Sequence, residues 1–174
     1  MKILVVGLVA LVALCETAQA QSMRGREPSP SYFSIFGEYD YYADTASNSQ
    51  SGGGAGIGWT INRYFGLQGG GQFLSKSGID LTNLYAEAKL SWPITPNFSV
   101  YASAGGAYAD ASATVTLLTA PPTTFTVSTS ATGYRAGLGA EYWLGKHWGL
   151  RAGWHRQNAG GVADDIGVGV AFRF

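Results

Sequence analysis

The stretch that decides the fold is Ile166–Phe174, with the sequence IGVGVAFRF. Every second residue is large and apolar, and the residues between them are Gly, Ala or Arg. This period of two is typical of a β-strand whose two faces meet different surroundings. The apolar face consists of Ile166, Val168, Val170, Phe172 and Phe174. We therefore predict a strand with large apolar side chains on one face and small or charged side chains on the other.

Similar alternation recurs along the chain and predicts about eight strands. The clearest earlier case is Leu81–Trp92, in which alanine, leucine and tryptophan alternate with polar residues such as Glu87 and Lys89. An α-helix would mix these two sets around its surface, whereas a strand separates them. The predicted strands are Tyr32–Tyr42, Gly53–Ile61, Phe65–Leu74, Leu81–Trp92, Phe98–Ala109, Ser130–Leu144, Trp148–Gln157 and Ile166–Phe174.

The N-terminus has the features of a secretory signal peptide. Met1–Ala20 combines a basic residue at Lys2, an apolar core and small residues at the predicted cleavage site, and its apolar run is short for a membrane helix. The single cysteine, Cys15, lies within this segment, so the exported chain would have no disulfide. We expect a cleavable signal peptide at 1–20, a periplasmic lead-in at 21–31 and a barrel domain at 32–174.

The composition favours a protein that crosses a membrane with strands. Only 13% of residues are charged, and the 11 basic residues balance 11 acidic ones, which gives no reason to expect a nucleic-acid partner. Alternating strands explain how overall hydrophobicity stays moderate while charge is scarce. Because an open sheet edge cannot be satisfied in lipid, such strands must close into a barrel.

The connections alternate in length. Short turns follow the second, fourth and sixth strands. Longer polar segments follow the first, third, fifth and seventh, namely Ala43–Gly52, Ser75–Asp80, Asp110–Thr129 and Asn158–Asp164. This asymmetry is expected when short turns face the periplasm and long loops face outward. The longest, Asp110–Thr129, is either a β-ribbon that extends its two strands or a mobile loop.

Aromatic residues gather near the predicted strand ends, as in the interfacial girdles of membrane barrels. The predicted girdle consists of Trp59, Trp92, Phe98, Trp148 and Trp154.

The mature chain resembles the small outer-membrane β-barrel family typified by the OmpA transmembrane domain. The resemblance rests on GAGIGWTINRYFGLQGG at 54–70, AEYWLGKHWGLRAGWHR at 140–156 and the ending VGVAFRF at 168–174. It implies an all-β, eight-stranded antiparallel up-and-down transmembrane barrel. It also implies that the last strand, Ile166–Phe174, is the signal read by the barrel-assembly machinery.

The inward face of the predicted barrel carries acids and bases that should form ion pairs, because an unpaired buried charge is costly. If one turn centres on Lys146, Glu141 and Arg151 are cross-strand neighbours. The predicted lumen network consists of Glu38, Glu87, Lys89, Arg135, Glu141, Arg151 and Arg173. An eight-stranded barrel is filled by side chains, so we expect a structural plug. The alternative is a narrow, low-conductance, porin-like path that opens by partner exchange among Glu87, Lys89, Glu141 and Arg151.

Two other classes of protein, a lipid-modifying enzyme and a soluble lipocalin-like barrel, fit the sequence less well. A lipid-modifying enzyme would need an activated nucleophile, but His147 lies in a turn, and His155 has no serine at same-face spacing. We expect His155 to form hydrogen bonds in the lumen or at its rim, and Asp164–Asp165 to be a solvated loop pair. A soluble lipocalin-like barrel would place the apolar face inside, where the large side chains would overfill a small lumen.

We therefore predict a monomeric integral protein of the outer membrane of a Gram-negative cell, with a structural role and the presentation of surface loops. No catalytic residue, metal or cofactor is expected. The expected partners are outer-membrane lipid and lipopolysaccharide, and the assembly machinery during insertion.

Overall fold

The computed structural model describes residues 31–44, 49–76, 79–117 and 123–174. The predicted signal peptide, 1–20, and all but the last residue of the predicted lead-in, 21–31, lie outside these ranges and stay predictions. Within the described ranges, no helix is long and apolar enough to span a membrane.

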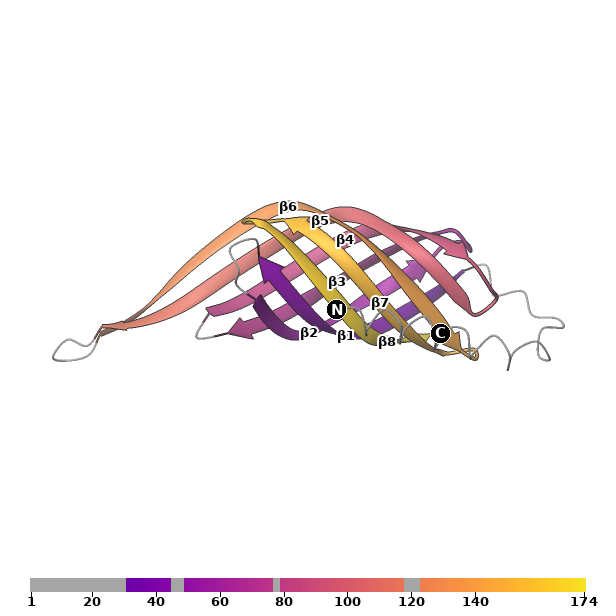
Figure 1. Cartoon of the computed structure of the whole chain (residues 1–174), viewed down its shortest axis with the longest axis horizontal. Coiled ribbons are helices and arrows are strands. Elements are labelled where there is room, and N and C mark those ends of the chain that lie inside the picture. Colours follow the sequence, from indigo (N-terminus) through magenta and orange to yellow (C-terminus); the bar gives the residue numbers. More distant parts are fainter. Residues whose placement is uncertain (1–30, 45–48, 77–78, 118–122) are drawn as a thin grey trace, which may run out of the picture.

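Eight antiparallel strands close into an up-and-down barrel in which β8 pairs back onto β1 (Figure 1). The strands are β1 (Tyr32–Asp44), β2 (Ser49–Thr60), β3 (Phe65–Lys76), β4 (Ile79–Pro93), β5 (Phe98–Leu117), β6 (Thr123–Leu144), β7 (Trp148–Asn158) and β8 (Val162–Arg173). The predicted fold class is confirmed. Closure leaves the barrel wall without an unpaired edge, which a lipid environment requires.

The short turns lie at one end of the barrel, which we call the turn end, and each has its own local support. Asn62 Oδ1 accepts hydrogen bonds from the backbone N–H groups of Tyr64 and Phe65, both at 2.9 Å. Thr95 Oγ1 accepts a bond from the Phe98 N–H at 3.0 Å. Gly145 adopts a φ of +77°, which glycine tolerates without steric cost.

Strands run further than predicted at the opposite end, which we call the loop end. β1 extends to Asp44, and parts of all four segments predicted as loops lie within strands. The ribbon alternative for 110–129 is correct over its described part, because β5 and β6 stay paired up to Leu117 and Thr123. Ser and Thr support the strand ladder as well as apolar residues do. Polarity therefore marks where a strand leaves an apolar environment, not where the strand ends.

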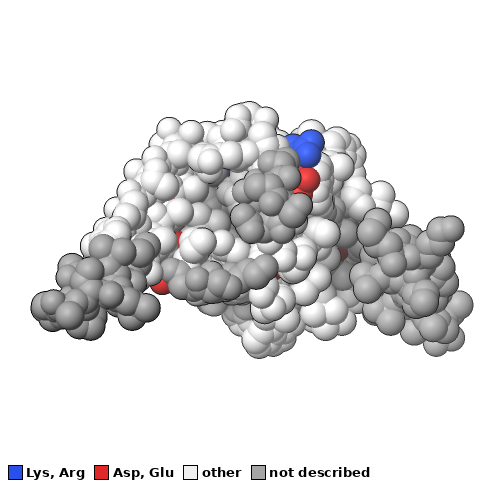
Figure 2. All heavy atoms as spheres, turned by 60° about the vertical axis from the view of Figure 1, so that its left-hand side comes forward, with Lys and Arg blue, Asp and Glu red and all other residues white. Residues whose placement is uncertain are grey.

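The barrel wall is apolar on its outer face and polar on its inner face, which is the reverse of a soluble protein. Trp92 and Val170 keep 46% and 50% of their surface exposed on the outside, whereas Glu87 and Arg151 keep only 3% and 5% inside. The lipocalin-like alternative requires the opposite arrangement and is wrong. Figure 2 shows the consequence for one side of the molecule, where charged side chains are sparse.

The outer surface carries both sets of apolar residues that the sequence predicts there. In β8, Ile166, Val168 and Val170 point outward, and Phe174 beyond the strand is also exposed. Phe172 contacts the Trp148 ring edge-on, with ring centroids 5.0 Å apart. Trp59, Trp92, Trp148 and Trp154 are exposed and Phe98 is half-buried.

Inward-facing glycines make room for large inward-facing side chains. A Cβ atom at Gly139 of β6 would collide with the Tyr101 ring of β5. The Tyr101 ring therefore lies across the lumen where its neighbouring strand has no side chain, and the interior is filled.

Candidate functional site

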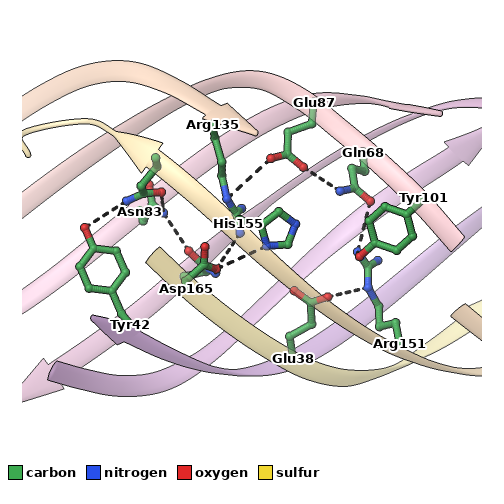
Figure 3. A network of polar contacts seen from close by, with 12 residues as sticks. Glu38, Tyr42, Gln68, Asn83, Glu87, Tyr101, Arg135, Arg151, His155 and Asp165 are labelled. Atoms are coloured by element: carbon green, nitrogen blue, oxygen red, sulfur yellow. Dashed lines mark hydrogen bonds and ion pairs between the residues drawn. The ribbon is translucent and has the colours of Figure 1, made fainter. Parts of the chain in front are cut away.

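Polar side chains from seven of the eight strands are buried in the lumen, whereas β2 contributes glycines at its inward positions 52, 54, 56 and 58. We call the connected part of this set the lumen network (Figure 3). The buried polar residues are Asp40, Gln68, Gln72, Asn83, Glu87, Lys89, Ser103, Arg135, Glu141, Arg151, His155, Gln157 and Asp165. Strand alternation places them inside, and the neighbouring glycines leave the space that they occupy.

The half of the lumen network near the turn end is built around Glu141. Lys89 Nζ donates to both Glu141 carboxylate oxygens, at 2.9 and 3.1 Å. Arg151 is the direct cross-strand partner of Glu141, as the sequence predicts, and its Nη1 lies 4.0 Å from Glu141 Oε1. Glu141 therefore lies between two cations.

Arg151 links this half to the rest of the network. Its Nε forms an ion pair with Glu38 Oε1, and its Nη2 donates to Gln68 Oε1 at 3.2 Å. The guanidinium also lies 3.8 Å from the centre of the Phe36 ring. Such cation–π packing stabilises a cation that has lost its water.

Gln68 and Glu87 join the two halves of the network. Gln68 Nε2 donates to Glu87 Oε2 at 2.7 Å, and Glu87 Oε1 lies 3.6 Å from Arg135 Nε. Arg135 in turn lies 4.0 Å above the Tyr85 ring. A continuous chain of polar contacts therefore runs from Lys89 toward the loop end.

The half near the loop end centres on Asp165. Arg135 Nη2 lies 2.8 Å from Asp165 Oδ2, Gln72 Nε2 donates to the same oxygen at 3.0 Å, and His155 Nδ1 lies 3.6 Å from it. Beyond this carboxylate the contacts are between neutral groups. Asn83 Nδ2 donates to Gln72 Oε1 and to Gln157 Oε1, at 2.8 and 2.6 Å.

Apolar and aromatic groups close both ends of the lumen. At the loop end, buried Tyr42, Leu74 and Ala163 form one cluster with half-buried Leu81 packed against it. At the turn end, Trp143 packs edge-on against Tyr32, with ring centroids 5.7 Å apart. The polar network is thus enclosed in the middle of the barrel.

The structure brings six of the seven predicted network residues together, and the assignment of Arg173 is corrected. Arg173 forms no ion pair among the described residues. Its Nη2 donates to the Gly145 carbonyl at 3.2 Å, and its guanidinium lies 4.4 Å from the Trp143 ring centre. The cause is its position as the last residue of β8, where the inward direction leads to the barrel mouth.

Two buried aspartates, Asp40 and Asp165, lie in the lumen but are not among the predicted network residues. The solvated pair predicted at 164–165 is wrong, because Asp165 is 1% exposed and lies in the lumen. Asp164 points outward, where its Oδ1 lies 3.0 Å from Arg156 Nε. The alternation of β8, carried back two residues from Gly167, would have placed Asp165 inside. Asp40 has the inward parity of Glu38, and it is also 1% exposed.

The lumen network is suited to closing and stiffening the barrel. Within the described residues, no group of three or more His, Cys, Asp and Glu side chains could hold a metal ion. His155 lies in the lumen as predicted, but its Nδ1 is 3.6 Å from Asp165 Oδ2 and neither ring nitrogen has a hydrogen-bond partner among the described residues.

Taken together, an apolar outer surface, aromatic residues near the strand ends and an ion-paired interior define a β-barrel of the kind that spans membranes. The sequence profile of the outer membrane protein beta-barrel domain matches residues 6–174. The chain belongs to this family.

Several solved structures of bacterial outer membrane proteins have the same fold. The N-terminal β-barrel domain of Pseudomonas aeruginosa OprF is 18% identical, with 85% of this chain and all of that chain covered at a TM-score of 0.63. A major outer membrane protein from Thermus thermophilus is 14% identical, with 84% and 100% covered at 0.67. Ail, the attachment invasion locus protein of Yersinia pestis, is 16% identical, with 83% and 97% covered at 0.59. A comparison with curated protein sequences finds no match.

Proposed function

We propose that this protein is a closed, non-enzymatic barrel of a Gram-negative outer membrane that supports the membrane and displays its loop end outside the cell. The observation that carries the proposal is the lumen network. Glu87, Arg135, Glu141 and Arg151 are each at most 5% exposed, and they are held by partners on other strands. An interior filled in this way stiffens a barrel and blocks free diffusion through it.

The proposed partners follow from the outer surface. The exposed apolar residues suit lipid and the acyl chains of lipopolysaccharide, and the outward face of β8 suits the assembly machinery during insertion. The proposal includes a monomeric barrel, because closure already satisfies the backbone of the wall.

Three measurements test this proposal. A closed barrel migrates differently in boiled and unboiled detergent gels, and its purified form gives no conductance in a planar bilayer. Cleavage of the loop end by protease added to intact cells tests the orientation. Identical migration in both gels, or protection of the loop end on intact cells, would contradict the proposal.

A narrow low-conductance path is the second candidate, and the position of Glu141 favours it. Glu141 lies between Lys89 and Arg151, so a small movement can exchange its partner. A cavity of about 70 Å³ at the turn end is lined by Glu141 together with Trp143 and Arg173. Bilayer recordings with discrete openings that change in Glu141→Ala would support this path. A flat trace in both proteins would end it.

A further inference from the structure

The ribbon formed by β5 and β6 extends beyond the other strands at the loop end (Figure 1). β6 pairs with β7 only from Arg135 onward, whereas its pairing with β5 continues back to Thr123. Residues 125–132 of β6 therefore have β5 on one side and no strand among the described residues on the other. We call this segment, FTVSTSAT, the β6 edge.

The β6 edge lacks the features that normally protect an edge strand. It contains no charge, proline or glycine, and it is rich in β-branched residues. Its residues from Phe125 to Ser130 are exposed. A row of backbone N–H and C=O groups of this kind is a template for an added strand. Its composition is also that of segments that pair with identical copies of themselves.

The two faces of the ribbon differ. Cross-strand partners lie on the same face, so Ala113 joins Val127 on one face, and Thr114 joins Thr126 on the other. Phe125 and Val127, on the first face, are 43% and 54% exposed. The occupant of the edge should therefore be a strand that continues an apolar face on one side and a Ser/Thr face on the other.

We propose that the β6 edge binds the β6 edge of a second copy of this protein, held in an apposed membrane. A two-fold axis perpendicular to the ribbon makes the two edges antiparallel and joins their apolar faces on the same side of one four-stranded sheet. That operation points the two barrels toward each other, so they lie in opposed bilayers. The contact rests on the proposed display of the loop end outside the cell.

The same geometry disfavours side-by-side pairing of two copies in one membrane. Copies in one bilayer are related by an axis along the membrane normal, which makes two edge strands antiparallel only if they lie flat along the membrane surface. The absence of charge on the β6 edge also favours a second copy over a charged peptide as the partner. Two identical edges approach without like-charge repulsion, and a charged peptide gains no complementary charge. Many copies on each surface would make weak single contacts strong together.

The test uses vesicles that contain the purified protein, with clustering followed by light scattering. Vesicles with the unchanged protein should cluster as protein density rises. In registers that place Val127 of one copy opposite or diagonal to Val127 of the other, the introduced charges lie within about a Debye length of each other. Val127→Lys vesicles and Val127→Asp vesicles should therefore each cluster about tenfold more slowly than vesicles with the unchanged protein. A mixture of the two variants should restore the rate, since opposite charges then meet.

Thr114→Lys is the matched control, because it adds the same charge on β5 and on the Ser/Thr face. In the four-stranded sheet the two introduced lysines would be about 14 Å apart at strand spacings of roughly 4.8 Å, beyond a Debye length of about 8 Å at physiological salt. This variant should cluster like the unchanged protein. Each variant is first checked for a folded barrel by its migration in boiled and unboiled gels.

Three results would overturn the contact between copies: no clustering of the unchanged protein, clustering of the Val127 variants at the rate of the unchanged protein, or a mixture of the two variants that stays dispersed. A single-cysteine variant, Thr114→Cys in the chain without Cys15, reports through an impermeant maleimide that ribbons face outward on the vesicles. A failure of clustering with labelled, folded barrels therefore rejects the contact and leaves the closed-barrel proposal standing.

Discussion

Glu141 of β6 is the direct ladder partner of Arg151 of β7, yet its nearer cation is Lys89 of β4. The distances are 2.9 Å from Lys89 Nζ and 4.0 Å from Arg151 Nη1. Arg151 instead forms its close ion pair with Glu38 of β1. Pairing across the lumen therefore competes with pairing along the wall, and this competition determines how the lumen network responds to substitution.

Lys89→Met should destabilise the barrel by about 3 kcal/mol, because it leaves Glu141 buried with only a distant cation. Replacing both partners, as in Lys89→Met with Glu141→Leu, should cost less than Lys89→Met alone, since no unpaired charge remains. The measurement is the urea midpoint of unfolding in lipid vesicles. The matched control is the exposed pair Arg156–Asp164, where Arg156→Met should change stability by less than about 1 kcal/mol. Equal effects at the two sites would show that burial adds nothing.

Asp165→Asn and Asp40→Asn should differ strongly, although both side chains are 1% exposed. Asp165 is the close partner of Arg135, at 2.8 Å, so its neutralisation removes a buried ion pair and should cost about 3 kcal/mol. Asp40 is buried without an ion pair among the described residues, and the like charges of Glu38 and Asp165 act on it more strongly than the opposite charge of Arg135 or the contact with Gln72. Asp40→Asn should therefore leave stability unchanged or raise it. The same unfolding assay decides, and a larger loss for Asp40→Asn than for Asp165→Asn would contradict this account.

Much of this arrangement can be predicted from sequence, because a period of two fixes which side chains share a face. The pairing of Glu141 with Arg151 follows from the position of the turn at Lys146 alone. The contact of Arg135 with Asp165 does not, because β6 and β8 are not neighbours in the sheet and the pair meets across the lumen. Strand ends are also hard to predict, since the ribbon is built from Ser and Thr that resemble a loop in sequence. Arg173 occupies an inward position in the strand alternation but lies at the barrel mouth. The alternation alone does not tell how far along the barrel axis a residue lies.

Val168→Arg tests whether lipid surrounds the barrel. Val168 is 55% exposed at the middle of β8, so an arginine there would enter the apolar part of a bilayer and should cost about 2–4 kcal/mol. Leu144→Arg is the matched control, because Leu144 is similarly exposed, at 54%, but ends β6 at the rim, where the cost should be about 0–1 kcal/mol. Unfolding from vesicles measures both values. Equal tolerance of the two arginines would mean that water, not lipid, covers the outer surface.

Gly139→Ala tests whether the lumen is packed as tightly as the geometry indicates. The added methyl group would meet the Tyr101 ring, whose hydroxyl lies 3.5 Å from Arg151 Nη2, so the ring must move within a filled interior. The expected loss is about 1–3 kcal/mol. Gly106→Ala is the matched control on the outer surface, where the nearest atom to the new Cβ is the Gly133 carbonyl oxygen at 3.9 Å. That change should be neutral or stabilise the barrel by up to about 1 kcal/mol, because it reduces the freedom of the unfolded chain. Tyr101→Ala should remove only part of the cost of Gly139→Ala in the double variant, because the new Cβ would still lie 2.6 Å from the Ala152 carbonyl oxygen of β7. A cost that is undiminished without the ring would place its origin in the contact with the β7 backbone rather than in the packing of the Tyr101 ring.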